Sequence, residues 1–305
     1  MESKISKTVG VIGSSSMVGS RYCEQASNDF DLVKADLSGQ ILVDITDAES
    51  TDEFFKKHQF ANAILFSAFT DVDAAEKQRG DKSNTCWRVN VNGVENVVAA
   101  CLKYQRGLIF ISTSFVFDGT AGPYAEDSPF GPDLEKVSWY GITKIEAENI
   151  IKSQLSQYLI IRIAYPYRAG FEGKDDFAKR ILRNYHQGSL PPMFFNQALT
   201  PTFVDDLAPA IKLLITENQS QIFHLASPQI TTPYEFALYL IEVFGGDARA
   251  VQKGSIVDFL KRSGATPRTV NGALSVKRIS RLGFHPTGWR QGIKIIHGQS
   301  GGRLI

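Results

Sequence analysis

The sequence predicts an α/β fold, with a doubly wound parallel sheet and a smaller C-terminal α/β domain. Short apolar segments of strand length alternate with segments of helical apolar spacing throughout the first half of the 305 residues. The first of these strands ends in a glycine-rich turn that leads directly into a helix. After residue 165 the regular alternation stops, and prolines interrupt a mixed pattern.

The first half contains the elements of the sheet and its covering helices. The helix at 46–59 begins with Thr46 as its expected N-cap, and acidic residues follow in its first turn. Strands with short, nearly continuous apolar runs are typical of a parallel sheet that is covered on both faces. The expected strands are 7–13, 30–37, 61–69, 106–117 and 157–165, and the expected helices are 15–28, 46–59, 84–104 and 138–152.

The second half is expected to contribute elements to both domains. A helix at 204–215 and a strand at 221–227 repeat the pattern of the first half, and a helix at 231–245 begins with threonine and proline start signals. We therefore expect a first domain at 1–165, to which 202–226 return. The second domain comprises 166–201 and 227–305.

Composition excludes several classes of protein. A net charge of +1, from 33 basic and 32 acidic residues, gives no reason to expect nucleic acid or an anionic membrane as partner. No apolar run has the length of a membrane span or of a signal peptide, so we expect a cytoplasmic protein. The three cysteines and five histidines lack ligand spacing, so we expect neither a disulfide framework nor a metal site.

The segment VGVIGSSSMVGS places Gly13 and Gly19 six residues apart, after a strand and before a helix. A dinucleotide pyrophosphate needs a tight turn at the first position and close helix packing at the last, and the helix start then offers N–H groups to the phosphates. Ser16 replaces the expected middle glycine. A glycine turn without a ligand is the alternative, but the strand–turn–helix context favours a Rossmann-type dinucleotide site.

Asp36 closes the second expected strand, 17 residues after Gly19. A carboxylate there accepts hydrogen bonds from an adenosine ribose and repels a 2′-phosphate, which favours NAD(H) over NADP(H). Alternatively, Asp36 caps the loop 36–40. The residues expected to contact the cofactor are Gly13, Ser15, Ser16, Met17, Val18, Asp36, Ser67, Ala68, Phe69, Tyr140 and Lys144.

Tyr140 and Lys144 stand four residues apart at the start of a helix, so they share one face of it. A tyrosine keeps its proton up to a pH of about 10, and a neighbouring ammonium lowers that pKa. The pair is either a device for proton transfer or an accident of composition, and its spacing alone does not separate the two.

Five segments resemble, in order, successive motifs of the dTDP-4-dehydrorhamnose reductases. These are extended short-chain dehydrogenases that reduce the 4-keto group of a nucleotide-linked 6-deoxysugar. The closing segment TPRTVNGALSVKRISRLGFHPTGW is similar to the end of that family, so the likeness covers nearly the whole chain. The five segments are VDITD (43–47), FSAFTDVDAAE (66–76), STSFVFDGTAGPYAEDSP (112–129), YGITK (140–144) and LTPTFVDDLA (199–208).

The resemblance implies a catalytic triad of Thr113, Tyr140 and Lys144. Hydride delivery to a carbonyl carbon creates an alkoxide that needs a proton, and the phenol of Tyr140 can supply it. We expect the ammonium of Lys144 to lower the pKa of that phenol and to hold the nicotinamide ribose. Thr113, at the C-terminal end of its strand, can donate a hydrogen bond to the carbonyl oxygen.

The expected sugar pocket departs from the family pattern. Ser114 and Phe115 stand where the family has Asp and Tyr, and Tyr165 stands where the family usually has Trp. Gln197 and Thr202 lie in a segment, NQALTPT, that also differs. We expect these five residues to bind the substrate, a nucleotide sugar that need not be dTDP-4-dehydrorhamnose.

Two other functions remain open beside an NAD(P)H-dependent reductase of a 4-keto nucleotide deoxysugar. One is a nucleotide-sugar epimerase with bound NAD. A dehydratase is disfavoured, because dehydratases resemble one another in having an Asp-Glu pair after the catalytic Thr to protonate the leaving hydroxyl, and here Ser114 and Phe115 stand in its place. The other is a non-catalytic nucleotide-binding module, as in the regulatory subunit of methionine adenosyltransferase. A homodimer is also left open.

Overall fold

The computed structural model describes residues 7–305, and the chain divides into two compact units. Unit 1 comprises the residues up to Val116 together with Val137–Arg162 and Ala208–Phe223. Unit 2 comprises Phe117–Lys136, Ile163–Leu207 and His224–Ile305. The segment 117–136, which the sequence analysis assigns to the first domain, is grouped with unit 2.

Unit 1 is built on a six-stranded sheet with the order β2-β1-β3-β4-β5-β7. The pairs β1–β2, β1–β3 and β3–β4 are parallel, and this confirms the expected doubly wound sheet. The order reverses between β1 and β3, which is where open α/β sheets bind ligands beyond their strand ends. The strands are β1 (Thr8–Ile12), β2 (Asp31–Ala35), β3 (Asn62–Leu65), β4 (Gly107–Thr113), β5 (Tyr158–Ile163) and β7 (Gln221–His224).

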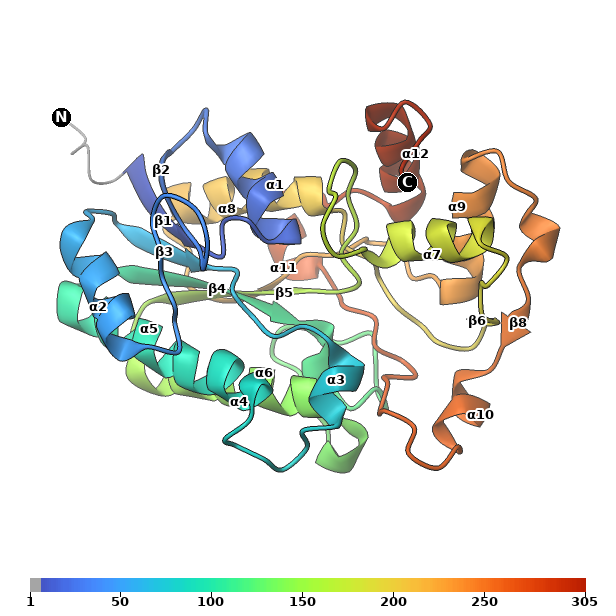
Figure 1. Cartoon of the computed structure of the whole chain (residues 1–305), viewed down its shortest axis with the longest axis horizontal. Helices are drawn as coiled ribbons and strands as arrows, with labels where there is room; N and C mark the ends of the chain where they lie inside the picture. The colour runs from blue at the N-terminus through green and yellow to red at the C-terminus, as the bar shows by residue number, and fades with distance from the viewer. Residues whose placement is uncertain (1–6) are drawn as a thin grey trace. The chain divides into compact units, whose positions relative to one another are not determined.

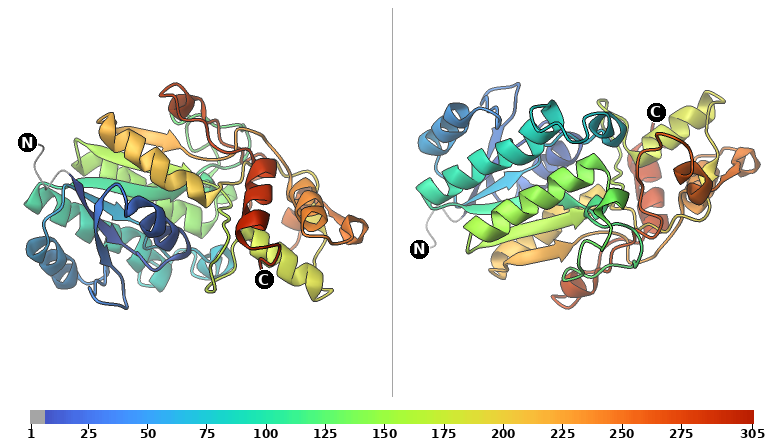
Figure 2. Two further views of the ribbon diagram at one scale, coloured as in Figure 1. Left: turned by 90° about the horizontal axis from the view of Figure 1, so that it is seen from above. Right: turned by 90° about the horizontal axis from the view of Figure 1, so that it is seen from below.

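Helices cover both faces of this sheet, as Figures 1 and 2 show. One face carries α1 (Met17–Ala26) and α8 (Leu207–Thr216), and the other carries α5 (Gly93–Tyr104) and α6 (Trp139–Gln154). Helix α2 (Ala48–Lys57) packs against α5. The shorter helices α3 (Val72–Glu76) and α4 (Thr85–Trp87) contact α6.

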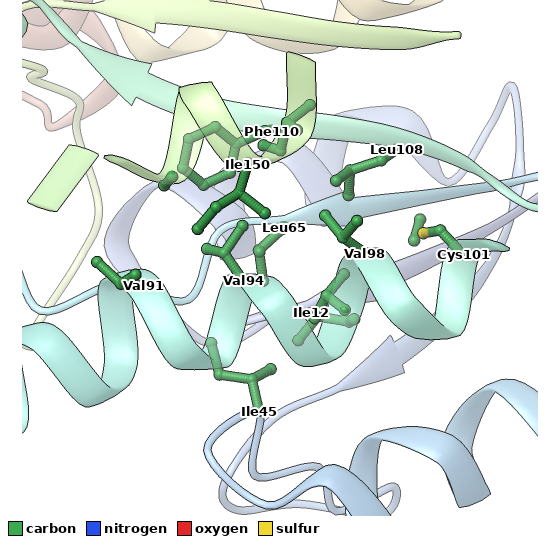
Figure 3. Packing of buried hydrophobic residues seen from close by; sticks show 14 of the residues in the cluster. Ile12, Ile45, Leu65, Val91, Val94, Val98, Cys101, Leu108, Phe110 and Ile150 are labelled. Atoms are coloured by element: carbon green, nitrogen blue, oxygen red, sulfur yellow. The ribbon is translucent and has the colours of Figure 1, made fainter. Parts of the chain in front are cut away.

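Burial on both faces explains the continuous apolar runs of the strands. Val94, Val98 and Cys101 of α5 point from the helix toward Leu108 and Phe110 of β4, as Figure 3 shows. All five side chains are buried. Fully burying an aliphatic side chain of this size contributes about 1.5–3 kcal/mol, so this layer holds α5 and β4 in a fixed relation.

Local polar contacts set the helix starts, and one of them differs from the prediction. Asp47, not Thr46, caps α2, because the Asp47 carboxylate accepts hydrogen bonds from the N–H groups of Glu49 and Ser50. The hydroxyl of Thr46 instead donates to Asp44 Oδ1 at 2.8 Å. The continuous helix expected over 84–104 is interrupted by a π-helical turn at Arg88–Asn92.

Unit 2 has its own apolar core. It is built from α7 (Phe177–His186), α9 (Pro233–Val243) and α12 (Trp289–Gln299), with Phe236 and Trp289 among its fully buried side chains. A two-stranded parallel sheet joins β6 (Met193–Phe194) to β8 (Lys253–Gly254). The short helices α10 (Ile256–Leu260) and α11 (Lys277–Ser280) complete the unit.

Two further observations concern the described part of the chain as a whole. Within residues 7–305, no helix is both long and apolar enough to cross a membrane. The same residues contain no cluster of three or more His, Cys, Asp or Glu side chains that could hold a metal ion. Cys23, Cys86 and Cys101 are buried free thiols.

Candidate active site

The glycine turn lies between the C-terminal ends of β1 and β3. Gly13 has a φ of +85°, and a β-carbon on it would come within 2.5 Å of the backbone nitrogen of Ser67, directly beyond β3. A β-carbon on Gly19 would overlap the carbonyl oxygen of Gly13. Only glycine fits either position, so the turn brings backbone, without side chains, to the point where the sheet order reverses.

Ser16 serves the turn as a helix cap. Its hydroxyl accepts a hydrogen bond from the N–H of Gly19 at 3.0 Å and donates one to the carbonyl of Gly13 at 2.7 Å. Ser16, which replaces the expected middle glycine, therefore stabilises the turn through hydrogen bonds within it. Met17 and Val18 follow in the first turn of α1, where backbone N–H groups and the positive end of the helix favour phosphate.

Asp36 is tied to the glycine turn. Its Oδ2 accepts hydrogen bonds from the backbone N–H and the hydroxyl of Ser15, at 2.8 and 2.7 Å. Its Oδ1 accepts one from the N–H of Leu37 at 2.8 Å, so Asp36 also caps the loop that follows β2. One carboxylate thus joins the β1–α1 turn to the end of β2, and this frame suits the pyrophosphate and ribose of a dinucleotide.

Ser67, Ala68 and Phe69 form the segment beyond β3, and a buried asparagine holds it. Asn90 Oδ1 accepts a hydrogen bond from the N–H of Phe69 at 2.8 Å, and its amide nitrogen donates to the carbonyl of Phe69 at 3.0 Å. The same nitrogen donates to Thr143 Oγ1 at 3.0 Å. The sequence analysis does not single out Asn90, although a polar residue within an apolar helical pattern is a usable signal.

Tyr140 and Thr113 are brought together by α6 and β4. Ser138 caps α6 by accepting a hydrogen bond from the N–H of Gly141 at 3.2 Å, so the helix begins just before Tyr140. Thr113 is the last residue of β4, and its hydroxyl is hydrogen-bonded to the phenol of Tyr140. Both side chains are buried. The ring of Phe115 lies edge-on to that of Tyr140, with centroids 6.0 Å apart.

Lys144 lies one turn along α6 from Tyr140, and its amine is buried against β4. Its Nζ donates a hydrogen bond to the carbonyl of Ile111 at 2.8 Å and lies 3.8 Å from the ring centroid of Phe110. A cation is attracted to the face of an aromatic ring, so both neighbours favour the ammonium form. Tyr140 and Lys144 therefore both contact β4 near its C-terminal end, at Thr113 and at Ile111 respectively.

The pKa values of this pair differ from the expectation that Lys144 makes the phenol more acidic. Burial raises the pKa of Tyr140 to about 12, and the hydrogen bond with Thr113 opposes that rise. Burial lowers the pKa of Lys144 to about 7, against the attraction of Glu148 and Cys86. Burial away from water is the largest cause of both pKa shifts, and it cannot be predicted from the spacing of Tyr140 and Lys144 in the sequence.

The expected substrate residues fall in both units. In unit 1, the Ser114 hydroxyl is buried and has no hydrogen-bond partner among the described residues. In unit 2, Gln197 donates to the phenol of Tyr165 at 3.1 Å and to the carbonyl of Thr269 at 2.9 Å. Tyr165 has a φ of +42°, a strained conformation for an aromatic residue that often marks a functional position.

Thr202 serves the fold of unit 2. Its hydroxyl accepts a hydrogen bond from the N–H of Ala164 at 2.9 Å and donates one to the carbonyl of Leu225 at 2.7 Å. The side chain is fully buried. Both hydrogen-bonding functions of the hydroxyl are therefore used within the protein.

Comparison with known families gives one match along almost the whole chain. The family model described as the RmlD substrate binding domain matches residues 7–299. A probable low-salt glycan biosynthesis reductase of Haloferax volcanii is 29% identical, over 83% of this chain and 79% of the relative. A dTDP-4-dehydrorhamnose reductase of Mycobacterium tuberculosis is 27% identical, over 94% of this chain and 91% of the relative.

Solved structures agree on the fold. The crystal structure of a dTDP-4-dehydrorhamnose reductase of Bacillus anthracis, in complex with NADP, superposes with a TM-score of 0.82. The match covers 96% of this chain and 99% of that structure at 22% sequence identity.

Proposed function

This chain belongs to the RmlD substrate binding domain family, and from that premise we propose that it is an NAD(P)H-dependent reductase of a 4-keto nucleotide-linked deoxysugar. The observation that supports the proposal is that Tyr140 and Lys144 contact the end of β4, at Thr113 and at Ile111 respectively. The glycine turn of the same unit supplies the frame for the cofactor. The match to the family extends over both units, and the two relatives described above are named as reductases.

Tyr140 is the proton donor of the proposed reaction. Bound NAD(P)H would supply the hydride, and the carbonyl oxygen of the sugar then needs a proton. A phenol with a pKa of about 12 keeps its proton at neutral pH, so Tyr140 is ready to donate in the reductive direction. Thr113 donates a hydrogen bond to the same oxygen and stabilises the charge that develops there.

Lys144 has two tasks in this proposal. Its ammonium form, held by the carbonyl of Ile111 and the ring of Phe110, stabilises the negative charge that Tyr140 acquires when it loses its proton. Its remaining N–H groups hold the hydroxyls of the cofactor ribose. With a pKa of about 7, the amine is only partly protonated at neutral pH. We therefore expect reduction to slow as the pH rises above about 7.

The cofactor preference rests on Asp36. Its carboxylate faces the glycine turn through Ser15 and would lie close to an adenosine ribose bound there. The carboxylate would repel the 2′-phosphate that NADPH carries on that ribose. We therefore propose that the chain uses NADH in preference to NADPH.

In unit 1, Ser114 is proposed to contact the sugar. The buried hydroxyl of Ser114 needs a hydrogen-bond partner, and a sugar hydroxyl or carbonyl would satisfy it. In unit 2, Gln197 holds the phenol of Tyr165 through a hydrogen bond, and the substrate contacts of these two residues stay predictions from the sequence. Since Ser114 and Phe115 differ from the family pattern, the preferred sugar need not be dTDP-4-dehydrorhamnose. The cytoplasmic location and the homodimer stay predictions from the sequence.

Purified protein with NADH and a panel of 4-keto nucleotide sugars tests the proposal. We expect NADH oxidation with at least one sugar, and loss of at least about 100-fold in kcat for Tyr140→Phe, because a proton donor contributes roughly that factor. Tyr104→Phe is the matched control: Tyr104 lies on α5 of the same unit, and its phenol contacts Asp52 rather than the triad.

The same experiment separates the alternatives. An epimerase would convert the sugar without net NADH oxidation and would retain NAD through purification. A binding module would bind nucleotide in calorimetry with no turnover by either the wild type or the Tyr140→Phe variant, and that outcome would contradict the reductase.

A further inference from the structure

A buried ion pair joins Glu148, on the same helix as Tyr140 and Lys144, to Arg162, and the proposed reaction gives it no direct contact with the reacting groups. Glu148 and Arg162 have side chains that are 0% and 2% exposed. Arg162 donates to both oxygens of Glu148, with Nε–Oε1 and Nη2–Oε2 distances of 2.9 and 2.6 Å. The hydroxyl of Ser112 donates to Oε1 at 2.6 Å. Each carboxylate oxygen thus has a directional partner from a strand.

The connections of Glu148 continue those of the triad. Tyr140, Lys144 and Glu148 follow one another at intervals of four residues on α6, so they share one face. Each of them meets the end of β4: Tyr140 meets Thr113, Lys144 meets the carbonyl of Ile111, and Glu148 meets Ser112. Three successive turns of the helix are therefore each tied to one of the last three residues of the strand.

Stability alone does not account for this pair. Removing two charges from water costs several kcal/mol per ion, and well-packed apolar residues of similar volume often give equal or higher stability. Apolar packing between α6 and β4 is already supplied by their neighbours in the core of unit 1. An ion pair differs from such packing in being directional, because it tolerates only one register of the helix against the strand.

We propose that Glu148 is a positioning residue, which through Ser112 and Arg162 fixes α6 against β4 and so holds Tyr140 and Lys144 at the end of that strand. The effect on catalysis rests on the proposed reductase function. Arg162 on β5 and Ser112 on β4 are its two anchors. A displacement of about 1 Å in such an arrangement can lower a rate by about 100-fold.

Glu148→Gln and the double variant Glu148→Leu/Arg162→Leu test the proposal together. We expect both to bind NADH and to lose about 10- to 100-fold in kcat per NADH-binding site, with KM changed by less than about 3-fold. The double variant should regain thermal stability relative to Glu148→Gln, since it buries no unpaired charge. The double variant should therefore be more stable than Glu148→Gln, while its kcat stays low.

Phe55→Leu is the control for general loosening of the core, because Phe55 is fully buried on α2, where its ring packs against Phe54 and Phe60. It should lower the melting temperature and keep kcat. Recovery of wild-type kcat in the double variant would overturn the proposal, as would an unchanged kcat in Glu148→Gln.

Crystallography of the double variant provides a readout that does not depend on turnover. We expect the distance from Lys144 Nζ to the carbonyl of Ile111, 2.8 Å in the wild type, to exceed hydrogen-bonding range. An unchanged distance would overturn the proposal. If the wild type turns over none of the sugars, the proposed function has failed, and this distance still decides whether Glu148 positions Lys144.

Discussion

At the scale of single residues, burial shifts the pKa values of Tyr140 and Lys144 on α6 in opposite directions. Tyr140, with a pKa of about 12, stays protonated, while Lys144, with a pKa of about 7, is close to its midpoint at neutral pH. This division suits reduction, in which the phenol gives up a proton. Oxidation of an alcohol would require the opposite starting state of Tyr140.

Lys144→Met should change how stability depends on pH. The folded-state pKa of Lys144 is about 7 and the unfolded value is 10.5, so between these pH values the unfolded chain binds more protons. The free energy of unfolding of the wild type should therefore rise with pH in this window, relative to Lys144→Met, by up to about 1.4 kcal/mol per pH unit. Below about pH 7 both states of the wild type carry the charge, and the two curves should run parallel.

Urea denaturation of both proteins from pH 6 to pH 10 measures this difference. All other titrating groups are common to the two proteins, so their contributions cancel to first order. Curves that stay parallel across the whole window would mean that Lys144 keeps an ordinary pKa.

Asp36→Ala should narrow the advantage of NADH over NADPH. The variant removes the charge that repels a 2′-phosphate, and it also releases Ser15, so NADH should bind about 10-fold more weakly while NADPH is affected less. Calorimetric titration with both cofactors measures the ratio. Asp29→Ala is the control, since Asp29 is a surface partner of Lys212. An unchanged ratio would refute the assigned role of Asp36.

At the scale of elements, the β1–α1 turn shows why glycine spacing is informative. Gly13 combines a left-handed backbone with close approach to Ser67, and Gly19 packs against the carbonyl of Gly13. Both requirements arise where the chain leaves β1 and enters α1 beside the end of β3. The spacing of the two glycines in the sequence therefore indicates this turn. The cap supplied by Ser16 satisfies the same turn by a different hydrogen bond.

Gly13→Ala should destabilise unit 1 and weaken NADH binding. The φ of +85° and the distance of 2.5 Å to the Ser67 nitrogen are both unfavourable for a β-carbon, at a combined cost of about 2–4 kcal/mol. Gly80→Ala is a matched control, because Gly80 has a φ of +83° and nothing within 4 Å of the added carbon.

The difference between these two variants isolates the close approach from the backbone strain. Urea denaturation and NADH titration of both measure it. Equal destabilisation, with NADH binding retained by Gly13→Ala, would contradict the role of the turn.

The elements also show where sequence reasoning stops. Alternating apolar runs predicted the strands and the order of the helices, because burial on two faces imposes those patterns. The π-helical turn at Arg88–Asn92 is not encoded in the apolar spacing of the helix, whereas the cap at Asp47 is a local contact with Glu49 and Ser50 and Asp is a preferred N-cap residue. The role of Glu148 is recognised only through the segments that it joins, whereas Asn90 stands out in the sequence as a polar residue in an apolar helical pattern.

At the scale of the whole chain, the family match spans 7–299 and so includes both units. Resemblance along the chain predicted the family and the class of reaction, since many short motifs in one order are far more specific than any one of them. The desolvation that sets the pKa values of Tyr140 and Lys144 is a property of the folded unit. It could not be predicted from the YGITK segment.

The most direct test of the central claim is a single turnover with NADH deuterated at C4 of the nicotinamide and a 4-keto nucleotide deoxysugar. We predict that the product sugar carries the deuterium at its former carbonyl carbon, and that Tyr140→Phe binds both ligands but forms this product at least about 100-fold more slowly. A wild-type protein that binds both ligands and transfers no deuterium to the sugar would contradict it.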